Sequence, residues 1–144
     1  MSNSLYERDF YAWANAQAAL LRAGKFDNAD IENIAEEIQS LARGEKRALA
    51  DRLTELLLHL LRWRFQPGFR GNVWRSMITE QRYRLDQHLA DNPSLKSQIE
   101  TIVHDAYRLA RLAAERETGL ARATFPKECP FTYDQAMDED YLPD

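Results

Sequence analysis

The chain has 144 residues, 44% of them apolar, which is the size of one ordinary domain with one sizeable core. Its 19 lysine and arginine residues against 23 aspartate and glutamate residues give a net charge of -4, a field that repels phosphate backbones and disfavours general nucleic-acid binding. With a single cysteine, Cys129, an internal disulfide and a zinc site of several thiolates are both excluded.

The N-terminal residues do not follow the order of an export signal, because residues 1–9 mix acidic and basic side chains where an apolar run is needed. The most apolar run, Leu56 to Leu61, contains His59 and ends at Arg62, whereas a membrane span needs about 20 apolar residues. We therefore expect a single soluble domain over residues 1–144, located in the reducing cytoplasm.

Apolar residues recur at three- and four-residue steps and no segment alternates like a strand, so the sequence predicts an all-α fold. The first helix is expected over about residues 6–23, with Gly24 as a left-handed stop. Asp30 caps a second and longest helix that continues to about Phe65 and ends at Gln66-Pro67-Gly68. Gly44 lies inside this helix and predicts a kink or a close helix contact.

Two further long helices and one short helix follow. The third begins after Asn72 and stops at residues 91–93, and the fourth places Pro93 in its first turn, with Asn92 as cap, and closes at Gly119. Thr132 and Gln135 match a capping box that starts a short last helix. The sequence thus predicts an antiparallel bundle of four main helices, with a short C-terminal helix and a proline-rich aromatic tail laid across an exposed seam.

Projection of the second helix at about 100° per residue predicts one apolar stripe along its length. The stripe consists of Ile31, Ile38, Ala42, Leu49, Leu53, Leu56, Leu60 and Trp63. On its flank, Glu45, Arg52 and His59 follow one another at seven-residue steps, about 10 Å apart along the helix.

This polar line supports two catalytic or ligand-binding interpretations. Arg52 and His59 have the loose spacing of small helical ribonucleases, in which histidine transfers protons and arginine steadies phosphate, and Glu55 stands one turn before His59. For a metal site, Glu55 with His59 and Glu100 with His104 are each four apart, whereas di-iron bundles use a spacing of three. The alternative is a half-buried His59 bonded to a carbonyl or carboxylate, with no metal and no cofactor.

Arginine and aromatic residues concentrate between Arg62 and Arg84, and this stretch is the best candidate for a binding surface for a protein, an anionic ligand or nucleic acid. The alternative is that the aromatic residues belong to the core and the arginines to an ordinary surface. The predicted surface consists of Arg62, Trp63, Gln66, Arg70, Trp74 and Arg82.

Short motifs in the same order along nearly the whole chain resemble a bacterial family called Domain of Unknown Function 29. They include Tyr6-Glu7-Arg8-Asp9-Phe10, Gln17-Ala18-Ala19-Leu20-Leu21, Leu57-Leu58-His59-Leu60-Leu61, Gln66-Pro67, Pro93-Ser94-Leu95, Glu117-Thr118-Gly119-Leu120 and Cys129-Pro130. The resemblance implies a compact helical fold and no established activity, cofactor or substrate.

No nucleophile elbow, phosphate-binding glycine loop or paired-cysteine motif occurs in the sequence. The leading hypothesis is therefore a non-enzymatic protein-interaction module that forms a homodimer or binds another protein. The alternatives are a phosphodiester-directed enzyme, ribonuclease or toxin-like, that uses His59 and Arg52, and a metal-binding helical bundle.

Overall fold

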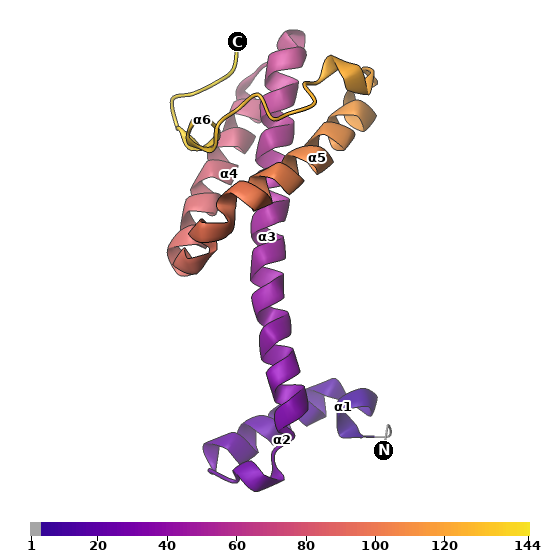
Figure 1. Ribbon diagram of the computed structural model, residues 1–144, viewed down its shortest axis with the longest axis vertical. Helices are drawn as coiled ribbons and strands as arrows, with labels where there is room; N and C mark the ends of the chain where they lie inside the picture. The colour runs from indigo at the N-terminus through magenta and orange to yellow at the C-terminus, as the bar shows by residue number, and fades with distance from the viewer. Residues whose placement is uncertain (1–3) are drawn as a thin grey trace. The chain divides into compact units, whose positions relative to one another are not determined.

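A computed structural model describes residues 4–144, which form helices joined by short turns and contain no strand, and it confirms the predicted all-α fold (Figure 1). The α-helices of these residues are α1 (Leu5–Arg8), α2 (Phe10–Arg22), α3 (Ile31–Phe65), α4 (Asn72–Asp91), α5 (Ile99–Thr118) and α6 (Tyr133–Met137). The 3₁₀ segments are η1 (Phe26–Asn28), η2 (Pro67–Phe69), η3 (Pro93–Gln98) and η4 (Arg122–Thr124). None of these helices is long and apolar enough to cross a membrane.

The chain divides into two compact units, Met1–Gly44 and Glu45–Asp144, and the division falls within α3. We call them the N-terminal unit and the C-terminal unit and describe each by itself.

In the N-terminal unit, the predicted first helix is wrong at one residue, because Asp9 interrupts it and separates α1 from α2. The Asp9 backbone has φ -153° and ψ 85°, and its Oδ1 accepts a hydrogen bond from the Ala12 amide at 3.1 Å. A short carboxylate side chain can accept hydrogen bonds from nearby backbone amides and so compete with the hydrogen bonds of a continuous helix. Here the Asp9 carboxylate caps α2. Gly24 has φ 74°, which confirms the left-handed stop after α2.

Aromatic side chains of α1 and α2 hold the first turns of α3. The Trp13 indole donates to the Asp30 carboxylate at 3.1 Å, and the Tyr6 hydroxyl donates to Glu37. Hydrogen bonds from Asn33 and then from Trp13 lower the pKa of Asp30, despite the opposing effect of partial burial. The Asn33 backbone amide also donates to the Asp30 carboxylate, and the Ile34 amide donates to the Asp30 carbonyl at 2.9 Å, so Asp30 occupies the capping position that the sequence predicted for α3.

In the C-terminal unit, the second part of α3 forms the core with α4, α5 and the tail (Figure 1). Leu49, Leu53, Leu56, Leu60 and Trp63 are all buried, so the predicted stripe is correct in this unit. Their buried partners include Ile78 and Leu85 of α4, Ile102, Ala106 and Ala110 of α5, and Phe125, Phe131 and Ala136 of the tail.

The stripe prediction fails in the N-terminal unit. Ile31 is 52% exposed and Ile38 is 61% exposed, and Ala42 is also exposed. Helical periodicity identifies a face that needs a partner but does not supply one, and α1 and α2 leave this face uncovered.

The junction between α4 and α5 also differs from prediction. The Asn92 side-chain amide donates back to the His88 carbonyl at 3.1 Å and caps nothing after it. Residues 93–98 consequently form η3, and α5 begins at Ile99 rather than at Pro93. The predicted end at Gly119, with φ 74°, and the capping box of Thr132 with Gln135 are both confirmed.

Gly44 does not make the close helix contact that was expected of it. A β-carbon added there would have no neighbour within 4 Å, and α3 continues through this position.

Replacing Gly44 by alanine should therefore stabilise the protein. Glycine in a helix interior costs about 1 kcal/mol relative to alanine, so Gly44→Ala should raise the free energy of unfolding in urea by up to about 1 kcal/mol. Gly119→Ala is the matched control: its φ of 74° strains any side chain, and it should lower the same free energy by about 1 kcal/mol. A loss of stability in Gly44→Ala would show that α3 is not a regular helix at this point.

Candidate functional sites

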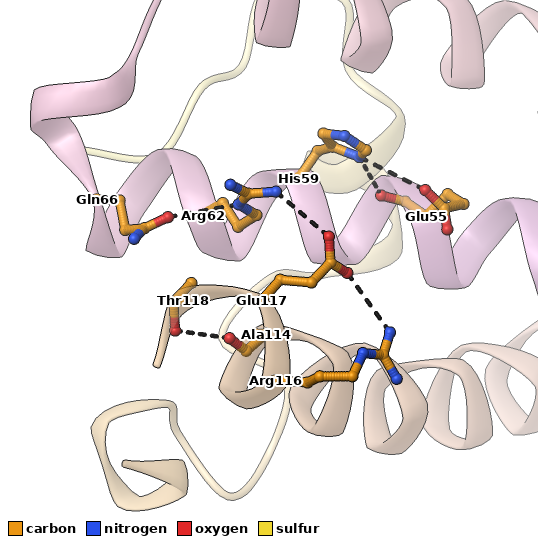
Figure 2. Close-up of polar contacts among 8 residues, drawn as sticks. All are labelled: Glu55, His59, Arg62, Gln66, Ala114, Arg116, Glu117 and Thr118. Atoms are coloured by element: carbon orange, nitrogen blue, oxygen red, sulfur yellow. Dashed lines mark hydrogen bonds and ion pairs between the residues drawn. The ribbon is translucent and has the colours of Figure 1, made fainter. Parts of the chain in front are cut away.

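His59 lies in the core of the C-terminal unit and is only 5% exposed. Its Nδ1 is 2.7 Å from the Glu55 carbonyl oxygen and 4.0 Å from Glu55 Oε2, one turn earlier on α3 (Figure 2). The sequence analysis gave a half-buried histidine bonded to a carbonyl or carboxylate as the alternative to a catalytic role, and the structure places His59 beside a carbonyl but buries it almost fully. A proton-transfer residue at this position would reach no substrate unless the core opened.

Arg52 faces a different environment. It lines a surface groove of about 520 Å³ between α3 and α4, together with Tyr83, Arg84 and His88. His59 is not part of this lining, and the structure does not bring the imidazole and the Arg52 guanidinium to one cavity. The geometry thus gives the ribonuclease interpretation no shared substrate site.

The two glutamate and histidine pairs do not converge. His104 lies on the exposed side of α5, where its Nδ1 is 3.4 Å from Asp105 Oδ1. Among residues 4–144, no three histidine, cysteine, aspartate or glutamate side chains are grouped so that they could hold a metal ion.

The predicted arginine and aromatic surface is partly internal. Trp63 is 5% exposed and Arg82 is 3% exposed, so neither side chain is available to a partner in the folded chain, contrary to prediction. Arg70 lies over the Trp63 ring at 5.3 Å and donates to the Trp63 carbonyl at 2.7 Å. These contacts join the end of α3 to the turn that follows it.

The remaining predicted residues are also occupied by contacts within the unit. Arg62 lies 4.6 Å from the centre of the Trp74 ring, donates to Gln66 at 3.4 Å, and is 3.5 Å from Glu117 on α5. The Glu117 carboxylate is also 3.6 Å from Arg116, so it stands between two guanidinium groups (Figure 2). The sequence located a real cluster here, but its arginines mainly join α3, α4 and α5.

Arg82 fixes the C-terminal tail. Its Nε donates to the Ala136 carbonyl at 2.7 Å, and its Nη2 donates to the Tyr141 carbonyl at 2.8 Å and the Gln135 carbonyl at 3.5 Å. Burial lowers the pKa of Arg82, and the charge of Asp138 opposes this effect in part. Backbone carbonyls thus satisfy a buried charge that has no buried carboxylate beside it.

Sequence reasoning missed a cationic groove between α5 and the segment after it. The groove has a volume of about 510 Å³ and is lined by His104, Arg108, Arg111, Leu112, Arg122, Lys127 and Glu128. The only sequence signal was the recurrence of His104, Arg108 and Arg111 at four- and three-residue steps, which places them on one helix face. The other wall comes from a separate segment, so composition alone could not reveal it.

The N-terminal unit carries a largely exposed apolar row on α3, formed by Ile31, Ile34, Ile38 and Leu41. We call this row the α3 stripe. It shares only Ile31 and Ile38 with the longer stripe predicted from the sequence. Leu41 is 72% exposed, more than either Ile31 or Ile38. Among residues 4–44, Trp13 is the only buried side chain.

The family model described as "Domain of unknown function DUF29" matches residues 5–142. The chain belongs to this family. No curated protein and no solved structure matches it. The resemblance seen in the sequence is therefore confirmed, and the DUF29 description gives no activity, so a functional conclusion must rest on the sites themselves.

Arg82 should be essential for tail docking. Arg82→Leu removes three hydrogen bonds to carbonyls and should lower the free energy of unfolding by about 2–4 kcal/mol, because hydrogen bonds to a charged group contribute about 1.5–3 kcal/mol each and the leucine recovers part of this by packing. Limited proteolysis should then cut within residues 132–144. The control is Arg84→Leu, which loses only an exposed pair with Glu80 and should change stability by less than about 0.5 kcal/mol. Equal effects of the two substitutions would contradict this role of Arg82.

Cys129 should be a slow nucleophile. Burial raises the pKa of its thiol, and its Sγ donates to the Phe131 carbonyl at 3.3 Å. Because the thiolate is the reactive form, the folded protein at pH 7.5 should react with a disulfide reagent at least about tenfold more slowly than the urea-unfolded chain. The difference should narrow as the pH rises toward the elevated pKa. Equal rates at pH 7.5 would show that the thiol is accessible and unperturbed.

Proposed function

We propose that the protein is a non-enzymatic protein-interaction module whose N-terminal unit pairs with a second copy of the chain. The observation that carries this proposal is the α3 stripe, a row of large aliphatic side chains that are about half exposed or more at three of its four positions. Exposed apolar rows of this kind are typical of interaction sites in soluble proteins.

The N-terminal unit does not bury enough apolar surface to account for its own stability. Apart from Trp13, its aromatic and aliphatic residues are at most partly covered, and Phe10 on α2 is half exposed. Chains of about 40 residues generally need further burial, a metal, disulfides or oligomerisation to fold, and helices of this length are marginal alone. A second surface that covers the α3 stripe would supply that burial.

The spacing of the stripe favours a second helix of the same kind as the partner. Its residues follow steps of three, four and three, which is the pattern of a coiled-coil seam. The flanking positions hold the small residues Ala35 and Ala42, which allow close approach, and Glu37, whose carboxylate accepts the Tyr6 hydroxyl. Two copies of this face bring matching aliphatic side chains together without an unsatisfied charge at the seam.

The seam has a defined end. The next residue in the same register is Glu45, which belongs to the C-terminal unit and whose Oε2 is 3.3 Å from His88 Nε2. The apolar register therefore stops at the boundary between the units, and the proposed contact is confined to the N-terminal unit.

The energy available is of the size that a reversible dimer needs. Full burial of an isoleucine or leucine side chain contributes about 1.5–3 kcal/mol, so covering the exposed parts of the stripe on two copies supplies on the order of 5–10 kcal/mol. Association costs about 4–15 kcal/mol, and Phe10 adds further surface. With a gain of about 10 kcal/mol and an association cost of about 4 kcal/mol, the net of about 6 kcal/mol corresponds to a dissociation constant on the order of 10–100 µM.

A charged pair placed in the stripe should abolish dimerisation. We expect the wild-type protein to sediment as a concentration-dependent dimer at 10–200 µM, roughly the range around the expected constant. Ile38→Glu with Leu41→Glu should sediment as a monomer, because two desolvated carboxylates would face two others. The matched control is Leu109→Glu with Leu112→Glu on α5, which replaces two leucines that are also exposed and should leave the dimer intact.

In nuclear magnetic resonance spectra, the amide signals of the C-terminal unit away from the substituted residues should be the same in all three proteins. A wild-type protein that is monomeric up to 200 µM would overturn the proposal, as would a stripe variant that remains dimeric.

A further inference from the structure

The groove between α5 and residues 122–128 concentrates positive charge in a protein of net charge -4. Four permanent cations line it, namely Arg108, Arg111, Arg122 and Lys127, against the single carboxylate of Glu128. Glu115 Oε1 is 3.0 Å from Arg122, so this pair is locally neutral and the excess positive charge rests on Arg108, Arg111 and Lys127.

Two of these cations have no compensating partner. Within residues 4–144, neither Arg108 nor Lys127 forms an ion pair. Like charges on neighbouring helical turns, such as Arg108 and Arg111, destabilise a helix. A bound anion would reduce this repulsion.

The walls of the groove are held in place by buried contacts. Phe125 is buried in the core, and Arg111 donates to the Phe125 carbonyl at 3.1 Å and to the Arg122 carbonyl at 3.2 Å. The buried Tyr107 donates from its hydroxyl to the Pro126 carbonyl. The backbone that carries Lys127 is thus fixed against α5, so both walls of the groove are in place before any ligand arrives.

We propose that this groove binds the phosphate group of a small phosphorylated molecule. Guanidinium and ammonium groups that converge on one site match the charge and the several acceptor oxygens of a phosphate. The groove volume of about 510 Å³ lies within the range of small-molecule sites. The exposed Leu112 at its edge offers an apolar contact for the rest of the ligand.

The site lies entirely in the C-terminal unit, so it is independent of the proposed dimer contact in the N-terminal unit. Failure of one proposal leaves the other unaffected.

The test is a titration of the isotopically labelled protein with inorganic phosphate at constant ionic strength, followed by nuclear magnetic resonance. Saturable shifts should appear at the Arg111 Nε–H and at the amides near Lys127. Arg108→Gln with Lys127→Gln should weaken binding at least about tenfold, because it removes the two unpaired cations. Both side chains are exposed, so the fold should be retained, which circular dichroism would verify.

The matched control is Lys46→Gln with Arg47→Gln, which removes one exposed lysine and one exposed arginine of α3 in the same unit and should leave the affinity unchanged. Shifts that do not saturate, or an affinity that falls equally in the groove variant and in the control, would overturn the proposal.

Discussion

The burial of one leucine-rich segment, from Leu49 to Leu61 on α3, is the interaction on which the rest of the C-terminal unit depends. These leucines are almost fully excluded from solvent and contact residues of α4, α5 and the tail. Each buried leucine contributes about 1.5–3 kcal/mol, whereas an exposed ion pair contributes about 1 kcal/mol or less. The polar His59 can lie within this segment because its Nδ1 has a hydrogen-bond partner, the Glu55 carbonyl one turn earlier.

The two parts of α3 lie in different environments, one buried and one exposed to solvent. Beyond Glu45 its apolar side is packed into a core, and before Gly44 its apolar side meets solvent. A continuous amphipathic helix thus packs one part into a core and leaves the apolar face of the other part exposed. The aromatic side chains of Tyr6, Phe10 and Trp13 contact one another and support the first turns of α3, but they do not cover its stripe.

Local signals in the sequence were sufficient for most helices and several of their ends, since Gly24, Gly119 and the Thr132 capping box act through neighbouring backbone groups. Local signals were insufficient where a polar side chain had more than one local hydrogen-bond partner within reach. Asp9 accepts from the Ala12 amide and interrupts a helix, and Asn92 donates back to the His88 carbonyl and does not cap the next helix. Local signals also failed where the partner is remote. Arg82 looked like a surface residue because its acceptors lie far along the chain, and the groove of Arg108 and Lys127 exists only after two segments meet. Periodicity reports that a face is apolar but not which element covers it.

The hydrogen bonds of Arg82 set an order on the assembly of the chain during its synthesis. Its acceptors at Ala136 and Tyr141 lie 54 and 59 residues later in the sequence. While α3, α4 and α5 emerge from the ribosome, this guanidinium has no carbonyl to receive it and must stay hydrated, because a bare charge cannot enter the core. Until the tail arrives, the core around α4 also lacks the buried side chains of Phe131 and Ala136. A chain that still lacks residues 136–141 therefore differs from one that has them in the hydration of the Arg82 side chain.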